Sequence, residues 1–152
     1  MRVAGLISDT HGLVRAEALR ALGGVDLIIH AGDVGAPQVL ERLRELAPVH
    51  AVRGNNDRGG WARALPESAV LELEGVRIHV LHDLEDLELD PRSAPPAVVI
   101  AGHSHRPSVD ARDGVLYVNP GSAGPRRFSL PVAVGFLELA AGAARARIER
   151  LL

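Results

Sequence analysis

The sequence predicts an α/β fold in which two mixed β-sheets pack face to face, with helices on the outside. In the first part of the chain, short apolar runs alternate with helical patterns, an order typical of a parallel sheet with crossover helices. The rest of the chain is rich in paired apolar runs that are typical of hairpins. The 152 residues are 47% hydrophobic and 24% charged, so we expect residues 1–152 to form a single domain with a substantial core.

Three strands and two helices are predicted before residue 54. They are, in chain order, a strand at 2–8, a helix at 13–22, a strand at 25–30, a helix at 36–47 and a strand at 49–53. Gly23-Gly24 is a good stop for the first helix, and Pro37 suits the first turn of the second.

Hairpins are predicted to dominate the rest of the chain. Their strands lie at 69–74 and 76–81, at 109–111 and 115–118, and at 132–139 and 143–151, and one further buried strand lies at 97–101. Each hairpin turn contains a glycine, which tolerates the backbone conformations of tight turns. The segment at 86–96 contains three prolines and is predicted to be a surface loop.

Composition excludes several classes of function. The chain has no cysteine, which removes disulfides, thiolate zinc sites and cysteine nucleophiles, and it has no lysine, which removes Schiff bases and Walker-type phosphate loops. The net charge is −2 and no basic run exceeds Arg126-Arg127, so binding to duplex nucleic acid is not expected. No apolar run approaches the ~18 residues of a membrane span and no signal sequence is recognisable, so the sequence predicts a cytoplasmic protein without membrane contact.

Polar side chains cluster where predicted strands end, which is where open α/β sheets bind their ligands. Taken singly, each cluster also fits a helix cap, a turn, a packed histidine or a solvated loop. Together they need another explanation, because the same few residue types recur at five sheet-to-loop junctions. The residues concerned are Asp9, His11, Asp33, Asn55, His82, His103 and His105.

These residue types indicate a metal site. Imidazole nitrogen, carboxylate oxygen and the asparagine carbonyl suit Mn, Fe, Zn or Ni when no sulfur ligand is present. Asp9 and His11, like His103 and His105, place two donors close together along the chain. Asp33 has two oxygens and could bridge two ions. We therefore expect two divalent transition-metal ions, with manganese as the first choice and Fe, Zn or Ni as alternatives.

In this order the motifs resemble the calcineurin-like metallophosphoesterase superfamily, and most closely its small single-domain bacterial and archaeal phosphodiesterases. The matching blocks are D-x-H at 9–11, G-D at 32–33, G-N-x-D at 54–57, the lone His82, G-H-x-H at 102–105 and N-P-G-S at 119–122. The resemblance implies a four-layer αββα sandwich. Ser122 does not complete G-x-S-x-G, because position 120 is proline, so a serine-hydrolase triad is disfavoured.

The resemblance also implies a role for each ligand. One ion would take Asp9, His11, Asp33 and His105, and the other would take Asp33, Asn55, His82 and His103. A hydroxide bridging the two ions, about 3.5 Å apart, would attack phosphorus in line. The positions implied to act in catalysis are Asp33, Asn55, His103 and Asn56.

Two positions depart from the family pattern. Members with strong general-acid catalysis carry histidine where this chain has Asn56, and close relatives often read H-G-H where this chain continues from His82 to Asp83 and Leu84. His79 is the alternative ligand to His82. Among the other histidines, His30 either holds a carboxylate behind the ligands or packs in the core, and His50 is predicted to lie on the surface.

Charge counting favours a diester substrate. Two divalent ions and two carboxylate ligands leave about +2, which one hydroxide and one diester anion neutralise. A dianionic monoester would need help from arginines such as Arg53, Arg58 or Arg106. The predicted function is a phosphodiesterase for a small phosphoester, with a nucleotide as one candidate. A phosphomonoesterase or nucleotidase is one alternative. The other is a metal-poor interaction scaffold, as in a retromer subunit of this fold. The sequence is also compatible with a homo-oligomer.

Overall fold

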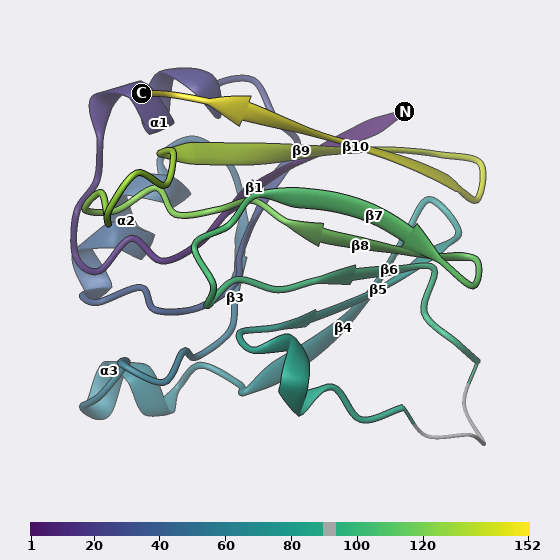
Figure 1. The fold of residues 1–152 in the computed structure, drawn as a ribbon, viewed down its shortest axis with the longest axis horizontal. Coiled ribbons are helices and arrows are strands. Elements are labelled where there is room, and N and C mark those ends of the chain that lie inside the picture. The colour runs from purple at the N-terminus through teal and green to yellow at the C-terminus, as the bar shows by residue number, and fades with distance from the viewer. Residues whose placement is uncertain (90–93) are drawn as a thin grey trace.

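Two five-stranded sheets stack face to face in the computed structural model, which describes residues 1–89 and 94–152 (Figure 1). The first sheet has the order β10-β9-β1-β2-β3, with β1 at Arg2–Ile7, β2 at Leu27–His30, β3 at Val49–Ala51, β9 at Ala133–Ala140 and β10 at Ala143–Arg150. The second has the order β4-β5-β6-β8-β7, with β4 at Ser68–Leu73, β5 at Val76–Leu81, β6 at Val98–Ile100, β7 at Ser108–Arg112 and β8 at Val115–Asn119.

Each sheet contains three parallel strands that are extended by antiparallel strands. Strands β1, β2 and β3 are parallel neighbours, and so are β5, β6 and β8. Strands β9 and β10 extend the first sheet in antiparallel pairing, and β4 and β7 do so at the edges of the second. Because the carboxyl ends of parallel strands share one edge of a sheet, the loops after β1, β2 and β3 gather together, and so do those after β5, β6 and β8.

The main core lies between the sheets. Leu6 and Ile29 of the first sheet and Ile78 and Ile100 of the second are fully buried in one apolar cluster. Burying each such side chain stabilises the fold by about 1.5–3 kcal/mol relative to exposure. This packing fixes the sheets relative to each other, so loops from different sheets keep a constant spacing.

The two outer faces are covered unequally. Helices α1 (Ala16–Ala21) and α2 (Pro37–Arg44) lie against the first sheet, where Leu22 and Leu43 join a buried cluster with Ile28 and Phe136. Over the second sheet, the described residues form one 3₁₀ turn, η1 (Leu84–Asp86), followed by Leu87, which packs against Leu81, Val99 and Ala101. The predicted fold class is confirmed, with the layer over the second sheet reduced to little more than this turn.

Two helices differ from expectation. α1 begins at Ala16 rather than at 13, because the backbone amides of His11 and Gly12 donate to the carbonyls of Asp33 and Val34 and so hold the preceding residues in a loop. The one-turn helix α3 (Gly60–Arg63) was not predicted, and its Trp61 packs against the cluster beneath α2. The predicted loop at 86–96 includes residues 90–93, which lie outside the described residues. Among the described residues, no helix is long and apolar enough to cross a membrane.

Candidate metal centre

Five of the seven predicted ligands meet in two overlapping clusters where strands from both sheets end. One contains Asp9, His11 and His105, and the other contains Asp9, Asp33 and His82. Asp9 and His11 follow β1, Asp33 follows β2, His82 follows β5 and His105 follows β6. The clusters therefore join the two sheets at one end of the molecule.

The two carboxylates lie between the imidazoles. Asp9 Oδ1 is 3.4 Å from His105 Nε2, 3.8 Å from His82 Nε2 and 3.9 Å from His11 Nε2. Asp33 Oδ2 is 3.2 Å from His82 Nε2 and 3.9 Å from His11 Nε2. Each carboxylate thus faces the histidines predicted for both ions.

Hydrogen bonds from outside the clusters orient these side chains. Asp9 Oδ2 accepts from the Ser8 hydroxyl at 2.7 Å and from the His103 amide at 3.1 Å. Asp33 accepts from the backbone amide of Asn56 at 2.9 Å and from its side-chain amide at 3.1 Å. His82 Nδ1 donates to the Ala31 carbonyl at 2.8 Å. This bond turns His82 Nε2 toward the carboxylates, an arrangement typical of metal-binding histidines.

Several polar atoms of the predicted ligands are buried without a hydrogen-bond partner among the residues that the structure describes. They are Asp9 Oδ1, His11 Nε2, His82 Nε2 and His105 Nδ1. A buried polar atom left unsatisfied costs about 1–3 kcal/mol, and a divalent cation satisfies carboxylate oxygens and imidazole nitrogens at once. These residues therefore fit a metal centre of oxygen and nitrogen donors.

Electrostatics couples Asp33 to His82. Burial opposes ionisation of Asp33, but the adjacent His82 imidazole and the hydrogen bonds from Asn56 outweigh it and hold the pKa of the carboxyl below its usual range. Burial also opposes charging of His82, yet the adjacent Asp33 carboxylate and the bond to the Ala31 carbonyl raise its pKa. Without a cation the pair is thus stabilised as imidazolium and carboxylate. Because only neutral imidazole binds a metal, binding of a metal by His82 would release a proton.

The loops hold the ligands in strained backbone conformations. Positive φ angles occur at Asp9 (55°), His11 (47°), Asp33 (54°), His103 (73°) and His105 (62°). Non-glycine residues in this region cost about 1–3 kcal/mol each and tend to mark functional sites.

The glycine of the G-H-x-H block has a separate purpose: a Cβ on Gly102 would lie 2.7 Å from Asp9 Oδ2, so only glycine lets the β6 loop approach the carboxylate.

Asn55 and His103 lie at the rim rather than inside the clusters. The side chain of His103 is 46% exposed, and its Nε2 is 3.6 Å from Asp83 Oδ2. Its ring meets that of His82 edge to face, with centroids 5.2 Å apart. Asn55 is exposed and lines a cleft of about 810 Å³ together with His82. Both side chains are thus next to the clusters without contacting the carboxylates of Asp9 or Asp33.

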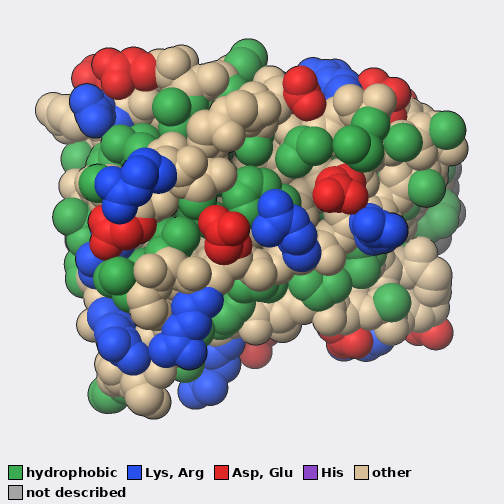
Figure 2. Space-filling model, turned by 90° about the horizontal axis from the view of Figure 1, so that it is seen from above, with side chains coloured by type: hydrophobic (Ala, Val, Ile, Leu, Met, Phe, Trp, Pro, Cys, Tyr) green, Lys and Arg blue, Asp and Glu red, His purple; other side chains and the backbone are tan. Residues whose placement is uncertain are grey.

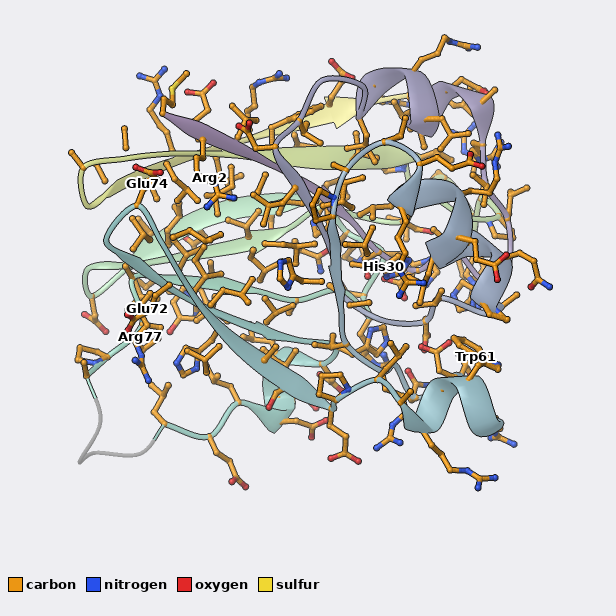
Figure 3. The ribbon with its side chains drawn as sticks, turned by 180° about the vertical axis from the view of Figure 1, so that it is seen from behind. Arg2, His30, Trp61, Glu72, Glu74 and Arg77 are labelled. Carbon is orange, nitrogen blue, oxygen red and sulfur yellow. The ribbon has the colours of Figure 1, made fainter. Side chains whose placement is uncertain are left out.

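The other histidines lie outside the clusters. His79 lines the same cleft, and His50 is exposed, as expected for a surface residue. His30 is fully buried, and Figure 3 places it in the interior, toward the end of the molecule that carries Trp61 and away from the Glu72–Arg77 pair. Within residues 1–89 and 94–152, its ring bonds to Thr10 and Gly32 and to no carboxylate.

His30 instead fixes two loop backbones. Its Nδ1 accepts from the Gly32 amide at 3.1 Å, so its Nε2 donates to the Thr10 hydroxyl at 3.0 Å. Thr10 in turn donates to the Val34 carbonyl at 2.8 Å. The chain of bonds ties the loop after β1 to the loop after β2, and so sets the spacing of Asp9 and Asp33.

Two further residues hold the loops, and sequence reasoning gave neither a role. Asp57 accepts from the amides of Gly54, Val34 and Gly35 at 2.9, 3.1 and 2.9 Å. Ser122 donates its hydroxyl to the Asp9 carbonyl at 3.0 Å. The sequence signal for both residues was their place in the G-N-x-D and N-P-G-S blocks. That signal did not show that their side chains form hydrogen bonds with backbone amides and carbonyls.

Comparison with known proteins gives the family. A sequence model of the calcineurin-like phosphoesterase superfamily domain matches residues 1–142. A probable metallophosphoesterase of Methanothermobacter thermautotrophicus is 34% identical over 139 residues, covering 84% of this chain and 80% of that protein. A phosphodiesterase of Methanocaldococcus jannaschii is 28% identical over 135 residues, covering 77% and 81%. The chain therefore belongs to the calcineurin-like phosphoesterase superfamily, which confirms the resemblance seen in its motifs.

A solved structure extends the likeness in fold. Vps29 of Chaetomium thermophilum superimposes with a TM-score of 0.79 at 18% identity, covering 99% of this chain and 97% of that chain. At this identity the likeness concerns the fold alone. It shows that the two-sheet sandwich persists while most side chains differ.

His30 should make stability depend on pH. Burial lowers the pKa of His30 to about 3, from 6.5 for an unperturbed histidine. The neutral ring is therefore favoured in the folded state, and its contribution is complete above pH 6.5 and lost as the pH falls toward 3. The expected slope is about 1.4 kcal/mol per pH unit below 6.5. Urea unfolding of metal-free His30→Gln should show a shallower loss of stability between pH 6.5 and 5 than wild type, whereas His50→Gln should match wild type. Parallel curves for wild type and His30→Gln would contradict this assignment.

Proposed function

We propose that the protein is a dinuclear-metal-dependent phosphodiesterase. The observation that carries the proposal is the set of buried, unpartnered ligand atoms around Asp9 and Asp33. In this proposal one ion is held by Asp9, His11, Asp33 and His105, and the other by Asp33, Asn55, His82 and His103. Manganese is the metal we favour, with Fe, Zn or Ni as alternatives that the same donors accept.

Asp33 is the bridging ligand in this assignment. Its Oδ2 faces His11 at 3.9 Å and His82 at 3.2 Å, and these histidines belong to different ions. Its lowered pKa keeps it ionised at every pH of interest. Asn56 supports the role because two hydrogen bonds from it fix the carboxylate plane.

When bound, the ions supply positive charge that lowers the pKa of water and offsets charge on the phosphoryl oxygens. The chain's own residues hold and orient that charge. Asp9 is fixed by Ser8 and the His103 amide, and His82 by Ala31. Preorganised ligands of this kind need no rearrangement during reaction, which is the main source of electrostatic catalysis.

The surroundings favour a diester over a dianionic monoester. Arg53 is paired with Glu67 at 2.8 Å, so it is not free to neutralise a second phosphoryl charge. The cleft beside His82 and Asn55 is also lined by acidic residues, namely Glu67, Asp83, Glu85, Asp86 and Glu88. An additional negative charge on the substrate is disfavoured there. Phosphomonoester or nucleotidase activity remains the second candidate for the same ligands.

The bridging assignment predicts a graded set of losses. Asp33→Asn should reduce hydrolysis of bis(p-nitrophenyl) phosphate by at least about 100-fold, more than His103→Asn or His105→Asn, because it weakens both ions rather than one. Chelation should abolish the activity, and elemental analysis should find two metals in wild type and fewer in Asp33→Asn. Asp110→Asn, which changes an exposed carboxylate paired with Arg112, is the matched control. Activity that survives thorough chelation would rule out the metal mechanism.

Thermal melting separates the enzyme from the scaffold alternative. Metal that binds only the folded state stabilises it by about 2.7 kcal/mol at 100 times its Kd, so Mn²⁺ should raise the melting temperature by roughly 5–10 °C. The Asp33→Asn variant should show a smaller shift. A metal-poor scaffold predicts equal melting with and without Mn²⁺ in both proteins.

Asn56 bears on the choice of leaving group. Attack at phosphorus places negative charge on the leaving oxygen, and a general acid that protonates it is worth about 10²–10⁴-fold. An asparagine amide donates hydrogen bonds but gives up no proton near neutral pH, and this one is already bonded to Asp33. His30 is buried with a pKa of about 3. Burial, and to a lesser degree Arg77, lowers the pKa of His79, so neither histidine is a good acid at neutral pH.

Rates should therefore fall steeply as the pKa of the leaving group rises. Asn56→His should flatten this dependence by speeding esters with alkyl or sugar leaving groups while leaving nitrophenyl esters nearly unchanged. The measurement is kcat/KM for a series of methyl aryl and methyl alkyl phosphodiesters, with His79→Gln as the control that should keep the wild-type slope. A shallow wild-type slope that Asn56→His does not alter would mean that the proton comes from another residue.

A further inference from the structure

The loop between β8 and β9 forms a wall of the candidate metal centre. The Ser122 hydroxyl donates to the Asp9 carbonyl, and the Ala123 amide donates to the Ser8 carbonyl, each at 3.0 Å. The Arg15 guanidinium donates to the Gly124 carbonyl at 3.2 Å. The base of the loop is therefore fixed directly behind the ligands of the first ion.

The tip of this loop is a tight turn that carries Phe128. The Leu130 amide donates to the Arg127 carbonyl at 3.1 Å, and Arg126 Nε donates to the Leu130 carbonyl at 3.2 Å. Phe128 has a φ of 52° and is 95% exposed. A left-handed backbone is unfavourable for a bulky side chain, and glycine or asparagine suits such a turn better.

Neither packing nor turn formation accounts for this phenylalanine. The other aromatic residues of the chain pack against apolar clusters: Trp61 and Phe136 on the first sheet, and Tyr117 on the second. Phe128 instead has its ring in solvent, where exposed apolar surface is unfavourable. An aromatic ring that is open to solvent can stack on a planar ligand such as a nucleobase.

Arg127 precedes Phe128 in the same turn and lies beside the first cluster. It is exposed and forms no ion pair with any residue in the ranges 1–89 and 94–152. Gly124, three residues before it, lies so close to the carbonyls of Asp9 and Thr10 that a Cβ there would clash with both. Figure 2 shows that arginine side chains gather toward one end of the face seen from above. A guanidinium without a carboxylate partner is available to bind an anion.

We propose that Arg127 and Phe128 bind the substrate, with Arg127 contacting a phosphoryl oxygen and Phe128 stacking on a planar aromatic group of the ester. This inference rests on the proposed phosphodiesterase function and adds a substrate class to it, namely phosphoesters that carry a nucleobase or an aryl ring. A phosphoester with only small alkyl groups would use Arg127 but leave Phe128 without a partner.

Binding of product monoesters to the Mn²⁺-loaded protein tests the proposal. Calorimetric titration with adenosine 5′-monophosphate, phenyl phosphate, methyl phosphate and inorganic phosphate separates the aromatic group from the phosphate. Phe128→Ala should weaken binding of the adenosine or the phenyl ester by about 10-fold and leave methyl phosphate and inorganic phosphate unchanged. Phe128→Tyr should keep wild-type affinity. An effect on the adenosine ester alone identifies a nucleobase as the ligand, and an effect on both aromatic esters identifies any aryl ring.

Arg127→Gln should weaken all four ligands by a similar factor of about 5. Arg145→Gln on β10, which also removes one exposed positive charge, is the control and should leave binding unchanged. The proposal is overturned if Phe128→Ala weakens all four ligands equally or none of them. A wild-type protein that neither binds phosphate with Mn²⁺ nor hydrolyses diesters would instead overturn the proposed function itself.

Discussion

Two carboxylates removed from water determine how this end of the molecule is built. Asp9 and Asp33 are 0% and 3% exposed, and a buried ionised carboxylate is unfavourable unless it is hydrogen-bonded and paired with positive charge. The bonds from Ser8, Asn56 and the His103 amide satisfy only part of each group. The remaining oxygens face imidazoles, so the site is complete only when positive charge is present, as a proton on His82 or as metal ions.

Placing these charges strains the backbone, and the rest of the fold maintains that strain. Five predicted ligands have positive φ, which an isolated loop would relax. Here a buried strand holds the start of each loop, and the bonds of His30 and Asp57 tie the loops after β1, β2 and β3 to one another. The inter-sheet core then fixes the distance between ligands from different sheets. Stability and site geometry are linked through these bonds, so substitutions at His30 should affect both.

The sheets, and the meeting of five of the seven predicted ligands, were predictable because they follow from local patterns. Apolar runs located every strand of the described structure to within a few residues, and Asp, His or Asn after five of them located the site. The start of α1 was not predictable, since it depends on bonds from His11 and Gly12 to a loop more than twenty residues away. The same holds for His30, which bonds to the Thr10 hydroxyl, and for Asp57, which bonds to the amides of Val34 and Gly35, because these partners are twenty or more residues away. The contact of His103 with Asp83 likewise needs two loops that sequence alone does not place together.

Charge is distributed unequally around the candidate centre, and this bears on how a substrate would be oriented. On the side of His82 and Asn55 the cleft carries several carboxylates, whereas the loop between β8 and β9, whose base bonds to the backbone of Ser8 and Asp9, carries Arg126 and Arg127. An anionic ester is therefore attracted toward the arginine loop and repelled from the cleft. Its phosphoryl oxygens would face Arg127, and an uncharged group would be the one best tolerated in the cleft. Under the proposed function, the electric field of the protein thus selects the orientation of the substrate as well as its charge. A diester with one aromatic group has the single negative charge and the uncharged group that this field favours.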